Sequence, residues 1–312
     1  MPTASSTGLI YVPINNSSEV EAYAPISSGT VNEAPAATIA GSNTGLGQPY
    51  TAALDASGKL YVANYGAASI TVYAPDPSGT LNETPLATIA GSNTGLQHPF
   101  GIAVDASGKI YVADLGSTSI AVFAANPSGA LDEAPLATIA GSNTGLNNGG
   151  GPYAIALDAS GKIYVSNEQS GADSVIVFAA NPSGTLNETP LATITGSSTE
   201  LNHPYGIAVD ASGKIYVANQ QAAAKSVTVY AANPSGTVNE TPVASIAGSN
   251  TGLVNPAGLA IDASGKIYVA DYGSDSVFIF AANPTGTVNA APLATIAGSH
   301  TGLNAPQGVA VR

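Results

Sequence analysis

The chain has 312 residues, with 20 acidic and 7 basic side chains, no cysteine and no tryptophan. A net charge of −13 without a basic cluster excludes nucleic acid and anionic membrane surfaces as partners, because both require lysine or arginine to neutralise phosphate. The absence of cysteine excludes disulfides, thiol catalysis and zinc sites built on thiolates. No apolar run is long enough to cross a bilayer, and a content of 44% hydrophobic against 9% charged residues indicates a folded chain.

The sequence consists of six repeats. A tyrosine inside an Ile/Leu-Tyr-Val motif marks each repeat, at Tyr11, Tyr61, Tyr111, Tyr164, Tyr216 and Tyr268. A second motif, Gly-Ser-Asn-Thr or a close variant, also occurs six times, beginning at Gly41, Gly91, Gly141, Gly196, Gly248 and Gly298. Because two motifs give the same count, the repeat of about 52 residues predicts six structural units.

Each unit predicts four β-strands. In the third unit, residues 101–105 and 110–114 have the two-residue period of strands, and an Asp-Ala-Ser-Gly turn joins them. Its carboxylate accepts local backbone N–H groups and its glycine adopts a positive φ. Residues 119–124 form a third strand, residues 126–129 a turn, and residues 136–140 a fourth, outer strand. Strands that are apolar on both faces suit blades stacked around an axis, which predicts an all-β propeller.

The two ends of the chain complement each other. The first unit begins at residues 9–12 without the Pro-x-Gly-x-Ala strand that opens later units, and the chain ends with this strand at residues 306–312. We therefore expect the C-terminal strand to complete blade one and to close the ring, which leaves no open sheet edge. A single propeller domain then spans residues 1–312.

The repeats resemble a known family. The run Gly302-Leu-Asn-Ala-Pro-Gln-Gly-Val-Ala-Val, with Asp-Ala-Ser-Gly-Lys-Ile-Tyr-Val-Ala-Asp in the preceding unit, is similar to the NHL-repeat β-propellers, and the resemblance covers essentially the whole chain. It implies six blades with the Gly-Ile-Ala-Val strand innermost. It also implies a ligand-binding face, formed by the loops that enter this strand and the loops that join the second and third strands. The family includes lyases, lactonase-like hydrolases and binding modules, so the resemblance implies no single activity.

The residue after the proline of the innermost strand is the first candidate site. In metal-using relatives within this resemblance, it supplies a His, Asn or Asp ligand. Here the six positions hold four aromatic residues, an alanine and an amide: Tyr50, Phe100, Tyr153, Tyr205, Ala257 and Gln307. These side chains cannot form a cage of imidazoles or carboxylates, so we expect no metal and no cofactor. The rings form either a plug within the channel or a collar that binds a neutral ligand such as a sugar.

A second set of polar residues ends the second strand of five units: Asn64, Asp114, Asn167, Asn219 and Asp271, with Ile14 in the first unit. Close to one channel, these side chains could bind a ligand, a cation or ordered water, or they could cap the following turn. Only two of the five are charged, whereas a tight calcium site needs more carboxylates. The set therefore predicts polar contacts but no metal site.

The remaining candidates for catalysis form no repeated pattern. His98, His203 and His300 have no partner at a repeated position, so we interpret them as loop residues. The carboxylates available for glycoside hydrolysis on the expected binding face are Asp114, Glu168, Asp173, Asp271 and Asp275. No pair among them stands out.

Blades four and five depart from the strict repeat. Extra residues occur at 147–151, at 168–173 and at 220–225. Because such insertions make these two blades differ from the other repeats, we expect specific ligand recognition in this sector. The first residues carry neither the charged start nor the apolar stretch of a signal peptide. The Ser/Thr/Asn-rich composition without cysteine is typical of a bacterial extracellular or periplasmic setting.

Taken together, these patterns predict a monomeric, non-catalytic propeller that binds a neutral small molecule, a glycan or a protein at the channel mouth. A lactonase, hydrolase or lyase with an unfamiliar active site is the alternative. Near-identical blocks such as Pro-Ser-Gly-Thr-Leu-Asn-Glu-Thr in units two and four also fit a repeat-derived or engineered scaffold without a natural ligand.

Overall fold

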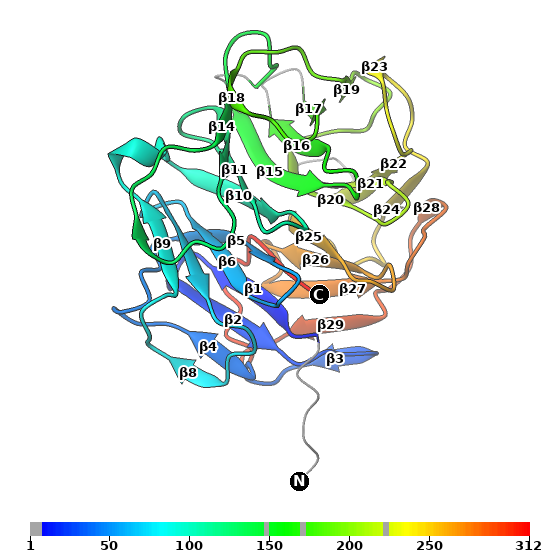
Figure 1. Ribbon diagram of the computed structural model, residues 1–312. Coiled ribbons are helices and arrows are strands. Elements are labelled where there is room, and N and C mark those ends of the chain that lie inside the picture. Colours follow the sequence, from blue (N-terminus) through cyan, green and yellow to red (C-terminus); the bar gives the residue numbers. More distant parts are fainter. Residues whose placement is uncertain (1–7, 147–149, 169–172, 221–224) are drawn as a thin grey trace.

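The computed structural model describes residues 8–146, 150–168, 173–220 and 225–312. Six β-sheets stand around a central axis, so the chain is an all-β, six-bladed propeller (Figure 1). Within the described ranges there is one short 3₁₀ helix, Ser92–Thr94, and no helix is long and apolar enough to cross a membrane. The six units predicted from the repeated motifs are the six blades.

In each of blades two to six, four antiparallel strands follow one another in chain order from the channel outwards, as predicted. The innermost strands are β5 (Pro49–Leu54), β10 (Pro99–Val104), β15 (Gly151–Leu157), β20 (Pro204–Val209) and β25 (Pro256–Ile261). The second strands are β1 (Ile10–Ile14), β6 (Leu60–Asn64), β11 (Ile110–Asp114), β16 (Ile163–Glu168), β21 (Ile215–Asn219) and β26 (Ile267–Asp271). The third strands are β2 (Glu19–Tyr23), β7 (Ser69–Tyr73), β12 (Ser119–Phe123), β17 (Ser174–Phe178), β22 (Ser226–Tyr230) and β27 (Ser276–Phe280). The fourth strands are β4 (Ala37–Ile39), β9 (Ala87–Ala90), β14 (Ala137–Ile139), β19 (Ala192–Thr195), β24 (Ala244–Ala247) and β29 (Ala294–Ala297).

A fifth strand, absent from the sequence-based prediction, links neighbouring blades. It is a Gly-Thr/Ala-Leu/Val segment that begins at the glycine of a Ser/Thr-Gly turn, and it pairs in parallel with the fourth strand of the preceding blade. These strands are β3 (Gly29–Val31), β8 (Gly79–Leu81), β13 (Gly129–Leu131), β18 (Gly184–Leu186), β23 (Gly236–Val238) and β28 (Gly286–Val288). Because β3 of the first unit pairs with β29 of the last, this exchange also joins the two ends of the ring.

The C-terminal segment lies beside β1 and closes blade one. Tyr11 and Ala310 exchange two backbone hydrogen bonds of 2.9 Å, and they form a single β-bridge rather than the full strand that the sequence predicts. Val309 and Ala310 are buried, and the Arg312 guanidinium donates to the Ala56 carbonyl at 2.7 Å. The ring is therefore closed twice, by this bridge near the channel and by the pairing of β3 with β29 at the rim.

The hydrophobic core lies between blades. Ile70 and Val72 of blade two pack with Ile110 and Val112 of blade three in one cluster, and each of these side chains is buried. The other main clusters likewise join two neighbouring blades. The second and third strands are thus buried on both faces, which explains why their sequences are nearly continuous apolar runs.

The Asp-Ala-Ser-Gly-Lys turns join the first and second strands at the end of the ring opposite the loops that carry the candidate site. In blade three, Asp105 Oδ1 accepts the backbone N–H groups of Ser107 and Lys109 at 2.8 and 2.9 Å, and Oδ2 accepts the Tyr111 hydroxyl at 3.3 Å. Burial opposes ionisation of this carboxyl, but the hydrogen bonds from Ser107 and Lys109 outweigh it and lower its pKa. The aspartate is therefore a structural part of the turn.

Candidate functional site

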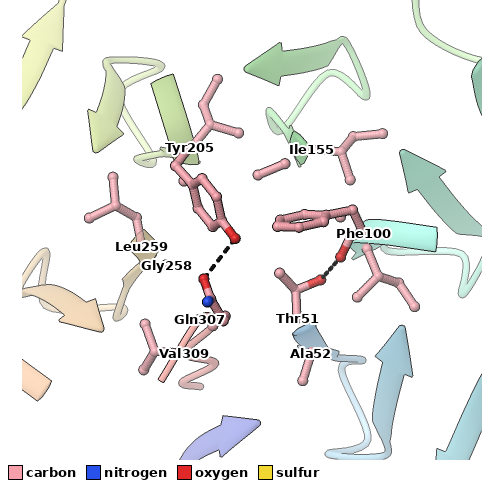
Figure 2. Close-up of a pocket in the computed structure, with 15 residues that line it drawn as sticks. Thr51, Ala52, Phe100, Ile155, Tyr205, Gly258, Leu259, Gln307 and Val309 are labelled. Carbon is pink, nitrogen blue, oxygen red and sulfur yellow. Dashed lines mark hydrogen bonds between the residues drawn. The ribbon is translucent and has the colours of Figure 1, made fainter. Parts of the chain in front are cut away.

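A register shift places the residue after each proline at the channel. The pairing of β10 with β11 shifts between Pro99 and Gly101, and the pairing of β20 with β21 shifts between Pro204 and Ile207. Such bulges bend a strand and redirect one side chain. Phe100 and Tyr205 accordingly point into the channel from two blades and line the same cavity (Figure 2).

The four predicted aromatic residues form one contiguous cluster with tilted and edge-to-face ring contacts. The ring centroid of Phe100 lies 4.6 Å from that of Tyr50, 4.9 Å from that of Tyr153 and 5.0 Å from that of Tyr205. Phe100 and Tyr205 are 2% and 8% exposed, whereas Tyr50 and Tyr153 are half-buried. Of the two arrangements that the sequence leaves open, this packing is that of a plug, with two rings still accessible from the mouth.

Gln307, from the C-terminal segment that closes blade one, also lines the channel. Its Oε1 accepts the Tyr205 hydroxyl at 2.7 Å, and the amide is 6% exposed (Figure 2). Burial raises the pKa of Tyr205 far above its ordinary value, so the phenol stays protonated and remains a donor. This contact joins blade five to the C-terminal segment across the channel.

The cavity in the channel measures about 50 Å³. It is lined by residues that follow the plug positions along the innermost strands, among them Gly101, Ile155 and Val309. One ordered water needs about 10–15 Å³ of such space, so the cavity accommodates a few waters but no sugar ring. A ligand of that size therefore does not fit inside this cavity.

The second predicted set of polar residues is buried and holds the loops that enter the innermost strands. Asp114 accepts the backbone N–H groups of Gln97 and His98 at 2.7 and 2.8 Å, and Asp271 accepts that of Val254 at 2.8 Å. Asn64 and Asn219 accept equivalent backbone groups at 3.2 and 3.1 Å. These are the contacts of turn-capping residues, whereas a role in ligand binding stays a prediction.

Asn167 is the exception in this set. Its Oδ1 is buried and has no hydrogen-bond partner among the described residues. Its Nδ2 donates to the Gly145 carbonyl at 3.4 Å. No group of three His, Asp or Glu side chains suited to a metal occurs in the described part of the chain.

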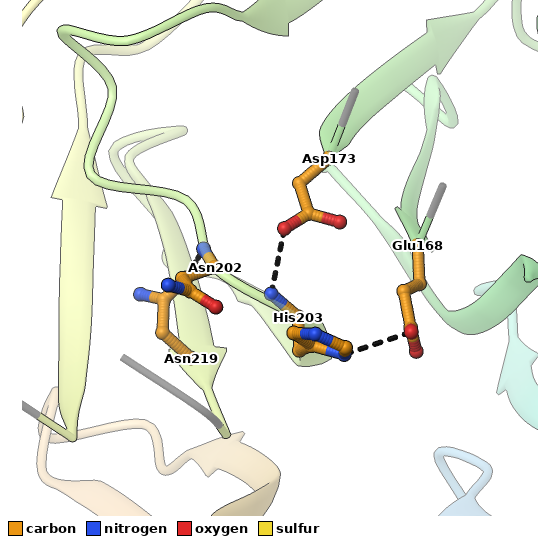
Figure 3. A network of polar contacts seen from close by, with 5 residues as sticks. All are labelled: Glu168, Asp173, Asn202, His203 and Asn219. Carbon is orange, nitrogen blue, oxygen red and sulfur yellow. Dashed lines mark hydrogen bonds and ion pairs between the residues drawn. The ribbon is translucent and has the colours of Figure 1, made fainter. Parts of the chain in front are cut away.

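An ion pair at the mouth was not predicted from the sequence. His203 Nδ1 lies 2.8 Å from Glu168 Oε1, and the two side chains are 37% and 22% exposed (Figure 3). The Asp173 carboxylate accepts the His203 backbone N–H at 2.8 Å. Burial, with Glu168 beside the phenol, raises the pKa of Tyr153, so the pair and the aromatic cluster share one site. The irregularity of blade four was the only sequence signal for this arrangement.

Aromatic side chains extend from the plug to the outer mouth. Tyr65 lies 4.9 Å from Tyr50 and stacks on His98 at 4.5 Å, measured between ring centroids. Tyr272 of blade six is 41% exposed. The candidate site thus combines stacked rings and phenol hydroxyls with one ion pair. The predicted recognition segments lie partly outside the described residues, because 147–149, 169–172 and 221–224 are not described.

The fold and this mouth define the class of the protein as a six-bladed β-propeller. The family described as "Lactonase, 7-bladed beta-propeller" matches residues 3–301, which is nearly the whole chain. The protein therefore belongs to this lactonase propeller family. Its ring has six blades where the family description gives seven, and the narrower assignment to NHL repeats has no support from this match.

Solved structures show the same fold at low identity. A protein of unknown function from Bacteroides caccae superposes with a TM-score of 0.64 and 12% identity over 98% of both chains. A chain in the crystal structure of a nidogen/laminin complex superposes with a TM-score of 0.58 and 16% identity over 97% of both chains. At these identities the similarity extends to the fold alone. No curated protein matches the sequence.

Proposed function

We propose that the protein is a non-catalytic binding module that holds a neutral ligand, such as a glycan, on the aromatic mouth of the channel. The observation that carries this proposal is the cluster of four aromatic rings. Phe100 and Tyr205 fill the channel, while Tyr50 and Tyr153 present half-buried rings above them. A ligand then meets a platform rather than a deep pocket.

The chemistry of the platform favours an uncharged, hydroxyl-rich partner. Aromatic faces stack on apolar faces of such ligands, and phenol hydroxyls orient their polar groups. Burial, and then the neighbouring Glu168, raises the pKa of Tyr153, so its hydroxyl keeps its proton at neutral pH. One oxygen of the Glu168 carboxylate is already in contact with His203 Nδ1 at 2.8 Å.

A glycan array with the purified protein tests this proposal. Tyr50→Ala and Tyr153→Ala should each weaken a positive signal at least tenfold, because stacked contact area is lost. Leu136→Ala is the matched control, since Leu136 is an exposed side chain of the outer rim and lies far from the mouth. Glycan binding that survives both tyrosine changes would contradict the proposal. The absence of any glycan signal would also contradict it.

A lactone hydrolase is the second candidate, supported by the family match and by the ion pair. With Nδ1–H directed at Glu168, His203 Nε2 is free to accept a proton from water as the water attacks a ring ester. As the C–O bond of the lactone breaks, His203 returns this proton to the leaving ring oxygen, and a hydroxy acid is released. Acid release from simple lactones measures this activity directly, and turnover abolished in His203→Gln would favour the hydrolase over the binding module.

A further inference from the structure

A carboxyl group is buried where the two ends of the ring meet. Glu21, on β2 of blade one, is only 4% exposed. It lies against the loop that leads from blade six to the C-terminal segment, so close that a Cβ added to Gly302 would sit 1.9 Å from its Oε1. Glu21 Oε2 contacts the Tyr23 hydroxyl, and this hydroxyl also lies 2.6 Å from the Thr301 carbonyl.

The repeats show how this position normally works. Blades two and five carry Thr-x-Tyr where blade one carries Glu-x-Tyr. The Tyr73 and Tyr230 hydroxyls donate to the carbonyls of Thr44 and Thr199 at 2.6 and 2.5 Å. In blade five, Thr228 Oγ1 in turn donates to the Tyr230 oxygen at 3.1 Å. In blade five, the residue two places before the tyrosine therefore acts as a hydrogen donor.

Blade one can repeat this chain of hydrogen bonds only with a proton on Glu21. The Tyr23 phenol has one proton, so it can donate a hydrogen bond to the Thr301 carbonyl or to Glu21, but not to both at once. If Tyr23 donates to Thr301, the short contact between Glu21 and Tyr23 needs a proton from the carboxyl. If Glu21 is ionised, Tyr23 must donate to the carboxylate, and the tie to Thr301 is lost.

We propose that Glu21 is protonated in the closed ring, and that its ionisation releases the Tyr23–Thr301 contact and loosens the junction between blades one and six. The same side chain thus makes ring closure sensitive to pH near neutrality. Burial is the main physical cause, because a charged carboxylate at this site has lost its water without gaining a cation.

The charged groups around Glu21 reinforce this assignment. Burial raises the pKa of Glu21 to about 7; the hydrogen bond from Tyr23 lowers it, and Glu19 on the same strand raises it further. The residues registered with Glu21 on β1 and β4 are Val12 and Thr38, which do not titrate. From the facing loop, His300 is exposed, and no basic side chain in the described residues forms an ion pair with Glu21.

The sign of the effect follows from proton linkage. The carboxyl has its ordinary pKa of 4.5 in the unfolded chain and about 7 in the folded ring. Between these values the folded state binds more protons, so stability falls as the pH rises and levels off above the folded pKa. Each unit of difference is a factor of ten, so the folding equilibrium constant falls by roughly 300-fold across this window of about 2.5 units.

Thermal and denaturant unfolding between pH 5 and pH 8.5 tests the proposal. Glu21→Gln keeps a donor for Tyr23 and Glu21→Thr copies blades two and five, so both should lack this fall, while the control Glu19→Gln should retain it. Carbon NMR of the wild-type Glu21 carboxyl provides a test that needs no variant. Titration near pH 7 would support the proposal, whereas titration near 4.5, or parallel pH profiles for wild type and Glu21→Gln, would overturn it.

Discussion

The aspartate turns show how single residues hold this repeat together. One carboxylate satisfies two backbone N–H groups and a tyrosine hydroxyl, and the same set of contacts recurs from Asp55 to Asp262. The sequence predicted these turns correctly, because every partner lies within six residues of the aspartate. The Glu168–His203 pair could not be predicted in this way, because its partners lie on different blades and are not repeated.

At this scale we expect Asp105→Asn to lower the free energy of unfolding at pH 7 by about 1–3 kcal/mol, the usual cost of weakening hydrogen bonds to a charged group. The folded pKa of Asp105 is lowered from 3.8, so its contribution is present above that value and is lost as the pH falls through the folded pKa. The difference between variant and wild type should therefore shrink in acid. Urea unfolding at pH 7 and pH 3 measures it, with the exposed Glu33→Gln as control.

At the scale of elements, period-two patterns predicted the four antiparallel strands of blades two to six, because each of these strands pairs with a near neighbour in the chain. The parallel fifth strand was missed, since its three residues follow a turn motif and its partner belongs to another unit. The bulges that aim Phe100 and Tyr205 at the channel were also beyond prediction. The sequence marks the positions but does not reveal which way each side chain points.

The innermost strands of neighbouring blades approach so closely that a side chain at some glycine positions should destabilise the ring. A Cβ added to Gly206 would lie 2.1 Å from the Ala257 carbonyl oxygen of the next blade. Gly206→Ala should therefore destabilise the protein by about 1–3 kcal/mol through overpacking. Blade four already has Ala154 at the equivalent position, so Ala154→Gly is the matched control and should cost no more than about 1 kcal/mol. Equal effects of the two changes in urea unfolding would argue against this packing.

At the scale of the whole molecule, complementary chain ends predicted closure of the ring, and the structure adds a second closure between β3 and β29. Function was less predictable. Fold and family leave both binding and hydrolysis open, because a propeller carries its activity in a few mouth residues that the repeat pattern does not specify.

Deletion of residues 308–312 tests the inner closure. It removes the Tyr11–Ala310 bridge and buried Val309, whose burial alone contributes about 1.5–3 kcal/mol. We expect a lower melting temperature but a folded ring, because the rim closure is retained. Removal of Arg312 alone is the control and should have a smaller effect. A truncated protein that melts like the full chain would show that the bridge does not stabilise the ring.

The central claim is that ligands are recognised on the mouth above a filled channel. A crystal structure of the protein soaked with the strongest ligand from the glycan array tests it most directly. We expect ligand density over Tyr50 and Tyr153, with Phe100 and Tyr205 unmoved beneath it. Density below Phe100, inside a channel that the rings have vacated, would show that ligands bind within the channel instead.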